Sequence, residues 1–182
     1  MFTDEQRGDL TASAPGVAVL TDDQRRHVVT KAMTWLGTTY HHRAAVRGAG
    51  ADCAMFPLSV FQVCGILPFD YRPPAYSVQW HLHHSEELYL KELARFAIEV
   101  TTPPRPADLV IFRFGRTFSH GAIVLDWPLI IHSCIPHGVV LSDATRDADL
   151  AGRDVKLFTM NAEAGLRESG FHRSHKPATQ SD

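Results

Sequence analysis

The chain has 182 residues, of which 45% are hydrophobic, and its formal net charge at pH 7 is -2. This length suits one domain, or one domain with tails, and allows a hydrophobic core without disulfide support. The charge argues against general nucleic-acid binding, which usually shows a basic excess. Three cysteines form no closed disulfide framework, and because none of them has CxxC spacing they argue against a structural zinc site.

The first elements are an arm and a helix. Residues 1–20 mix Gly, Pro, Ser and charge, which indicates a flexible N-terminal arm. A capping box at 21–24 then predicts a helix that stops at Gly37. Its apolar residues recur at helical spacing; they are Val28, Val29, Ala32, Met33, Trp35 and Leu36. Residues 38–51 are expected to form a loop.

A second helix is predicted to begin at Asp52 and to end before Gly65, with Pro57 causing a kink or a shortened first turn. Residues 65–84 have the composition of a loop rich in proline and histidine. A third helix is expected from Ser85 onward, and its inward-facing residues are Leu90, Leu93, Ala94 and Ala97.

From Pro103 onward the pattern changes to short β-branched or aromatic segments separated by turn residues. Five strands are predicted, at 108–114, 120–126, 129–134, 139–142 and 155–160. Short connections imply antiparallel pairing, and helices followed by strands indicate an α+β domain in which N-terminal helices pack on a central antiparallel sheet. Residues 161–182 are expected to be a flexible tail.

The N-terminus, residues 1–7, is polar and acidic and lacks the basic start and apolar run of a secretory signal. No stretch approaches the roughly 18 apolar residues of a membrane span. We therefore expect cytoplasmic synthesis, and retention in the cytosol unless a particle or another assembly carries the protein out.

Cys53 is the first candidate for chemistry. A free thiol has a pKa of about 8.5 and is a poor nucleophile at neutral pH without a base. With Asp52 as the cap, Cys53 is placed in the first turn of the second helix, where unpaired N–H groups and the helix dipole favour an anion and lower a thiol pKa. The alternative is a small packing residue, the commoner role of a lone cysteine.

Two later histidines are candidates for a base and its partner. His120 begins a strand after a turn, where it can face a cleft as a general base; the alternative is a surface or hydrogen-bonded core histidine. His132 shares a strand face with Ile130 and Cys134. Beside His120 its ring can orient the base, as Asp or Asn does in other triads, although taken alone His132 is better explained as a core histidine.

Five segments in this order resemble the NlpC family of papain-like cysteine peptidases, which cut peptidoglycan stem peptides. They are WLGTTY at 35–40, DCA at 52–54, PADLVIF at 106–112, SHGAIV at 119–124 and IIHS at 130–133. The resemblance covers roughly residues 25–160 and implies a papain-like NlpC fold at 21–160, with 65–102 inserted between nucleophile helix and sheet. Residues 40–54 and 80–83 are similar to the members carried by phage tails and gene-transfer-agent particles.

By position, the resemblance implies that Cys53 is the nucleophile, His120 the base and His132 the residue that orients it. Tyr40 stands where the family places a tyrosine beside the thiol, near the oxyanion site. The N–H of Cys53 is expected to be one oxyanion donor, and such a donor is typically worth about 10²–10³ in rate. The remaining candidates for the oxyanion and substrate side are Asp52, Ala54 and Trp80.

The chain departs from the family pattern at several places. Ala54 stands where the family usually has Ser, which removes a hydroxyl from the substrate side. Pro57 interrupts a helix that the family usually leaves smooth, and Ala107 replaces the Gly of a Pro-Gly-Asp turn. The insertion at 65–102 is long enough to cover or reshape the cleft.

Three close histidines, His81, His83 and His84, have side chains that bind metals. No acidic or cysteine ligand stands at a convincing spacing, so packing or substrate-wall roles are favoured, and we expect no metal and no cofactor. Arg43 and Arg47 lie just upstream of the nucleophile, where they either meet a carboxylate of a stem peptide or are solvated loop residues.

The sequence thus predicts a cysteine endopeptidase of cell-wall peptides, with peptidoglycan as substrate and phage-like tail or baseplate proteins as partners. The family preference implies cleavage between D-γ-glutamate and diaminopimelate. Two alternatives stay open: a structural tail component with an idle site, and an amidase on another substrate, since fold does not fix substrate. Cys53 precedes His120, which argues against the permuted relatives that act on lipids.

Overall fold

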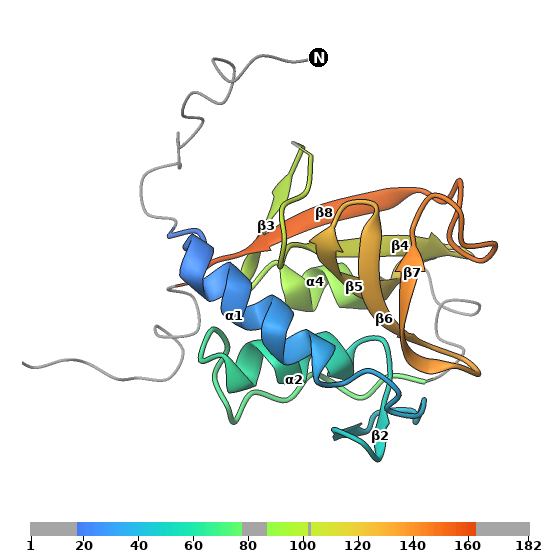
Figure 1. The fold of residues 1–182 in the computed structure, drawn as a ribbon, viewed down its shortest axis with the longest axis horizontal. Coiled ribbons are helices and arrows are strands. Elements are labelled where there is room, and N and C mark those ends of the chain that lie inside the picture. Colours follow the sequence, from blue (N-terminus) through green and yellow to red (C-terminus); the bar gives the residue numbers. More distant parts are fainter. Residues whose placement is uncertain (1–17, 78–86, 102, 163–182) are drawn as a thin grey trace, which may run out of the picture.

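The computed structural model describes residues 18–77, 87–101 and 103–162. Six strands form the main sheet in the order β3-β8-β4-β5-β6-β7, and each neighbouring pair is antiparallel. The strands are β3 (Ala97–Val100), β4 (Leu109–Phe114), β5 (Thr117–Asp126), β6 (Leu129–Cys134), β7 (Gly138–Asp143) and β8 (Val155–Met160). The helices α1 (Asp22–Met33), α2 (Met55–Val63) and α4 (Leu88–Leu93) all contact β5 (Figure 1). The predicted α+β fold, with helices on an antiparallel sheet, is confirmed.

Side chains alternate between the two faces of each strand, and in the central strand β4 the side chains on both faces are buried. Leu109 and Ile111 of β4 belong to the core cluster that also contains residues of α1 and α2. Val110 and Phe112 of the same strand belong to a second cluster with Ala122. The position of a residue along its strand therefore decides in which of the two clusters its side chain packs.

The sheet has one strand more than predicted. Ala97 was expected inside the third helix, but α4 ends at Leu93 and Ala97 begins β3. The segment pairs with β8, where Ala97 lies opposite Met160. Tertiary pairing of a β-branched segment outweighs the helical spacing that its apolar residues also satisfy. Ser85, where the helix was predicted to begin, lies outside the described residues.

Helix α1 starts as predicted, with the reciprocal Thr21–Gln24 capping box. It ends at Met33 rather than Gly37, and Met33 and Leu36 are exposed, so the predicted apolar face was too wide. Arg25 is buried instead, where its guanidinium donates to Oδ1 of Asp108 at 2.7 Å. This ion pair holds α1 against the start of β4.

Helix α2 begins at Met55, three residues later than predicted, so Pro57 lies in its first turn. There its missing N–H has no intrahelical role to lose. The expected loop at 38–51 contains a small hairpin of β1 (Ala45–Val46) and β2 (Gly50–Ala51).

Backbone contacts fix the segment before Cys53 to the sheet. The N–H of Val139 donates to the carbonyl of Thr38, and a Cβ added at Gly138 would lie 2.2 Å from that same oxygen. Ser133 Oγ donates to the carbonyl of Ala51 at 2.7 Å. The nucleophile candidate is thereby positioned by strands β6 and β7, which lie far from it in sequence.

The ends of the described chain meet. Val19 forms a β-bridge with Asn161, and the N–H of Ala162 donates to the carbonyl of Ala18 at 2.7 Å. Leu20 is buried in the core. The remainder of the predicted arm and tail lies outside the described residues. Of the helices in the described ranges, none combines the length and apolar character needed to cross a bilayer.

Candidate active site

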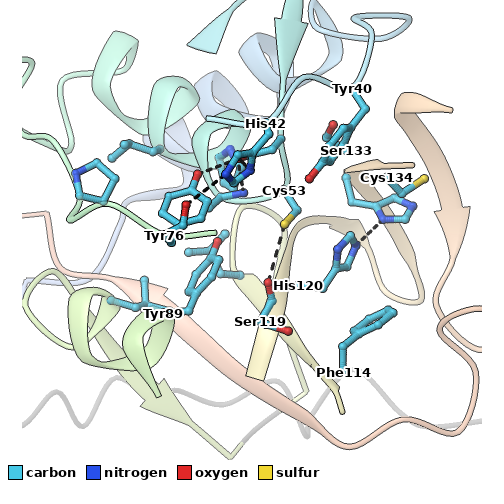
Figure 2. Close-up of a pocket in the computed structure, with 18 of the residues that line it drawn as sticks. Tyr40, His42, Cys53, Tyr76, Tyr89, Phe114, Ser119, His120, Ser133 and Cys134 are labelled. Atoms are coloured by element: carbon cyan, nitrogen blue, oxygen red, sulfur yellow. Dashed lines mark hydrogen bonds and ion pairs between the residues drawn. The ribbon is translucent and has the colours of Figure 1, made fainter. Parts of the chain in front are cut away.

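A cavity of about 730 Å³ is lined by residues of the helices α2 and α4 and of the strands β5, β6 and β7. It brings together six of the seven residues that the sequence suggested for catalysis or for the oxyanion and substrate side: Tyr40, Asp52, Cys53, Ala54, His120 and His132. The exception, Trp80, lies outside the described residues, as do His81, His83 and His84. Figure 2 shows Cys53 near the centre, with His120 on one side and Tyr76 and Tyr89 on the other.

The two histidines come from adjacent strands and are hydrogen-bonded to each other. Nε2 of His120 lies 2.7 Å from Nδ1 of His132. Strand register explains the meeting: His132 pairs with Ala122, so His120 is two residues away on the same face. The ring of His120 also packs against Phe114, with centroids 5.3 Å apart.

The Cys53 side chain is hydrogen-bonded to the backbone of β5. Its thiol donates to the carbonyl of Ser119, with sulfur and oxygen 3.7 Å apart, and the N–H of Gly121 donates to the sulfur. Burial, and next the Asp52 carboxylate, raise the pKa of the thiol to about 12. This direction is opposite to the lowered thiol pKa that the sequence predicted from a helix N-terminus.

Asp52 adds to the effect of burial on the thiol. Its Oδ1 accepts from the N–H groups of Ala54 and Met55, at 3.1 and 2.8 Å, and so occupies the donors that would stabilise a thiolate. Because α2 begins only at Met55, Cys53 lies before the helix rather than in its first turn. The cap is thus satisfied by a carboxylate whose negative charge disfavours a second anion next to it.

Both histidines are held neutral. Burial, followed by the neighbouring His132, lowers the pKa of His120 to about 3, with Asp147 acting in the opposite direction. Burial also lowers the pKa of His132, again opposed by Asp147. The raised pKa of the thiol and the lowered pKa values of the two imidazoles all favour the neutral forms over a thiolate–imidazolium pair in the resting site.

Three tyrosines border the thiol, and only Tyr40 was identified from the sequence. Burial raises the pKa of each phenol, so all three remain hydroxyl donors at neutral pH. Tyr76 donates to Oδ2 of Asp52 at 2.8 Å. Tyr76 and Tyr89 come from residues 65–102, the segment predicted to be an insertion, whose local sequence carries no periodicity that points to the site.

Tyr89 reaches the site because residue 121 is a glycine. A Cβ at Gly121 would lie 2.2 Å from the Tyr89 hydroxyl and 3.2 Å from the carbonyl of Cys53. The glycine thus lets the Tyr89 phenol of α4 lie against β5, next to the nucleophile candidate.

The arginines upstream of the thiol differ in their surroundings. The backbone N–H of Arg43 donates to Oδ2 of Asp52 at 2.7 Å, and its guanidinium lies over the Tyr76 ring, 5.8 Å from the centroid. Arg47 is exposed near the β1–β2 hairpin. Arg43 therefore contacts two residues that line the cavity, Asp52 and Tyr76.

Two further residues of the cavity were missed by sequence reasoning. Ser142 Oγ lies 3.0 Å from Nε2 of His132 and also hydrogen-bonds Asp147. Ser142 is an ordinary polar residue of a strand, and only the pairing of β7 with β6 brings it to His132. Asp147 belongs to the turn after β7, and no local motif marks it.

A departure from the family pattern also has a structural meaning. Ala107, in the place of a family glycine, adopts a φ of 69° and is fully buried. A left-handed conformation of this kind costs a residue with a Cβ roughly 1–2 kcal/mol. Ala107 therefore holds, at some cost in stability, a φ that a glycine would adopt freely.

The fold and the cavity define the class: a papain-like α+β domain with a cysteine before a helix and two histidines on adjacent strands. No protein-family profile and no curated protein matches the sequence. Solved structures identify the fold more closely. The NlpC/p60 domain of the peptidoglycan hydrolase SagA is 22% identical with a TM-score of 0.50, and the match covers 73% of this chain and 97% of that domain.

Two longer proteins show the same likeness. A Staphylococcus aureus protein of the NLP/P60 family, described as similar to lipoprotein, is 15% identical with a TM-score of 0.55, and the match covers 82% of this chain and 45% of that one. NlpC1 from Trichomonas vaginalis is 15% identical with a TM-score of 0.54, and the match covers 80% and 46%. The chain has the NlpC/p60 fold and spans about half the length of these two proteins.

Proposed function

We propose that the chain is a cysteine peptidase that hydrolyses peptidoglycan stem peptides. The observation that carries the proposal is the convergence of Cys53, His120 and His132 in one cavity, with the two imidazoles 2.7 Å apart. A nucleophile, a base and a group that orients the base are the parts that thiol acyl transfer requires. The likeness to a peptidoglycan hydrolase domain supports this substrate class.

The reaction starts from the neutral pair. When a peptide binds, the Cys53 proton moves from sulfur to His120, and the sulfur forms a bond to the carbonyl carbon. The N–H of Cys53 and the hydroxyl of Tyr40 are our candidates for stabilising the oxyanion. The carbon–nitrogen bond then breaks as His120 gives its proton to the leaving amine, which leaves a thioester.

Water completes the cycle. His120 accepts a proton from water as its oxygen attacks the thioester carbon, and the carbon–sulfur bond breaks. The departing sulfur recovers that proton from His120, and the carboxylic acid product leaves. In the resting state the thiol donates to Ser119, so the mechanism requires the proton to turn toward His120 before attack.

We place the cleaved bond between D-γ-glutamate and diaminopimelate, as the family resemblance implies. The stem peptide carries carboxylates, and the Arg43 guanidinium over Tyr76 is a cation at the cavity edge that can meet one of them. We further propose that the protein is delivered in the tail of a phage-like particle. The similarity of residues 40–54 and 80–83 to such members supports this setting.

The test is a digest of purified sacculi, with the soluble fragments analysed by mass spectrometry. Cys53→Ala should release no fragments, while the matched control Cys64→Ala should digest at the wild-type rate. Fragments that begin with a free diaminopimelate amine support the proposed bond. Full activity of Cys53→Ala would refute the mechanism, and fragments with an intact glutamyl–diaminopimelate link would refute the bond.

A structural tail component with an idle site is the second candidate. The observation that favours it is the thiol pKa of about 12 together with the thiol's hydrogen bond to the Ser119 carbonyl. In that case wild-type protein leaves sacculi intact, yet mass spectrometry finds the chain in purified particles. If the protein digests sacculi but is absent from purified particles, the peptidase proposal is supported and the tail role is refuted.

A further inference from the structure

A line of polar side chains continues beyond the two histidines, across three adjacent strands and into a turn. His120 on β5 is bonded to His132 on β6 at 2.7 Å, and His132 is bonded to Ser142 on β7 at 3.0 Å. Ser142 in turn hydrogen-bonds the carboxylate of Asp147. All four residues line the cavity that contains Cys53.

The carboxylate at the end of this line gives every hydrogen bond a direction. Partial burial raises the pKa of Asp147, but hydrogen bonds from Ser142 and from backbone N–H groups, together with the neighbouring His132, lower it on balance, so the group is an anion at neutral pH. An ionised carboxylate accepts hydrogen bonds and donates none. The hydroxyl of Ser142 therefore donates to Asp147, and its oxygen is left to accept from Nε2–H of His132.

The same reasoning fixes the tautomers of both imidazoles. With its proton on Nε2, His132 presents the lone pair of Nδ1 and accepts from Nε2–H of His120. His120 then carries no proton on Nδ1. This unprotonated nitrogen is the one that a general base needs in order to take the proton of Cys53.

We propose that Ser142 and Asp147 are positioning residues that set His120 as the base and supply the negative charge that a neutral His132 lacks. The proposal rests on the proposed function, since it assigns a task to the same His120. In triads with an aspartate, the carboxylate both selects the tautomer and stabilises the imidazolium formed during the reaction. Here Ser142 and His132 transmit that effect from one strand to the next.

Other charged groups near the histidines do not replace Asp147. Arg153 acts on His120 in the opposite direction and lowers its pKa. The Arg153 guanidinium lies 3.8 Å from the centroid of the Phe114 ring, which itself packs on His120. Asp149 lines the cavity and raises the pKa of Cys134, but it donates only its backbone N–H to Asp147. Asp149 is therefore a natural control, because it carries the same charge two residues away.

The first experiment uses nuclear magnetic resonance of the substrate-free protein with ¹⁵N-labelled histidine. Long-range proton–nitrogen correlations should show Nε2–H tautomers for both His120 and His132 near pH 7. Asp147→Asn should shift His132 toward a mixture of tautomers, and Asp149→Asn should not. An Nδ1–H tautomer of His132 in the wild type would overturn the proposal without reference to any variant or substrate.

The second experiment measures cleavage of a muropeptide as a function of pH. Loss of a hydrogen bond to a charged group should lower kcat about tenfold to 100-fold in Asp147→Asn with little change in KM. Removing the anion should also move the acid limb of kcat/KM to lower pH, because the imidazolium is less stable. Ser142→Ala should lose kcat similarly, whereas Ser142→Thr, which keeps the hydroxyl, should retain most of it.

The two experiments distinguish failure of the proposed peptidase function from failure of the positioning role of Ser142 and Asp147. If the wild type does not cleave the muropeptide, the proposed function fails while the tautomers still test the hydrogen-bond line. If Asp147→Asn lowers kcat without moving the acid limb or the histidine tautomers, Asp147 has only a structural role and the proposal is wrong.

Discussion

Replacing Asp52 by Asn tests the account of the resting thiol. The Asp52 side chain is 1% exposed, and its Oδ2 accepts from the N–H of Arg43 at 2.7 Å and from the hydroxyl of Tyr76 at 2.8 Å. An asparagine that keeps its oxygen toward the helix cap turns its NH₂ toward the Arg43 N–H, so one buried donor loses its acceptor. The substitution should therefore lower the stability of the fold and raise the reactivity of the thiol.

The stability cost can be estimated from these contacts. A buried donor left without a partner costs about 1–3 kcal/mol, and the remaining hydrogen bonds weaken because they no longer involve a charge. We expect a total loss of about 3 kcal/mol in the free energy of unfolding. For a chain of this size, that corresponds to a fall of roughly 6–12 °C in the melting temperature.

The same substitution should make the Cys53 thiol more reactive. Removing the Asp52 charge lowers the pKa of Cys53, because that carboxylate is the second-largest cause of its raised value after burial. Iodoacetamide labelling between pH 7 and 10, mapped by mass spectrometry, should therefore be faster at Cys53 in Asp52→Asn, with Cys64 unchanged as an internal reference.

The matched control is Asp108→Asn, which alters another buried carboxylate, one that does not line the cavity. It breaks the ion pair with Arg25 and should cost comparable stability, yet it should leave the labelling of Cys53 unchanged. If both variants accelerate labelling equally, general loosening of the fold explains the effect, and the electrostatic account of Asp52 is refuted.

Two further predictions concern pH and packing. Because the pKa of His120 is lowered from 6.5 to about 3, its contribution to stability is present above pH 6.5 and lost as the pH falls toward 3. The melting temperature should fall over this window, by less in His120→Gln; equal falls would exclude His120 as the cause. Gly121→Ala places a Cβ against the Tyr89 hydroxyl and should lower muropeptide cleavage at least tenfold. Gly65→Ala, at a positive φ with open space around it, should cost about 1 kcal/mol of stability but no activity; equal activity of the two variants would contradict the steric argument.

The fold could be predicted in outline because local patterns and long-range packing agree over most of the chain. The Thr21–Gln24 capping box starts α1, and the β-branched segments after Pro103 became strands of the sheet. The patterns failed where tertiary pairing decided the outcome. Ala97 joined β3 instead of the third helix because β8 offered it a partner.

The cavity, too, could be predicted only in part. Its chemical residue types, a cysteine with an acidic neighbour and two histidines on strands, are already present in the sequence around Cys53, His120 and His132. The sign of the thiol pKa shift was beyond prediction, because it depends on which N–H groups Asp52 occupies and how deeply the sulfur is buried.

The sequence by itself determined the residue types, the helix and strand periodicities, and the order of the candidate nucleophile and histidines. The tertiary structure decided which side chains meet: register places Ser142 beside His132, and the turn after β7 adds Asp147. It also placed Tyr89 of α4 against Gly121. The physical reason is that periodicity is a property of neighbours along the chain, whereas hydrogen bonds, burial and electrostatic fields depend on distances between segments that only folding brings together.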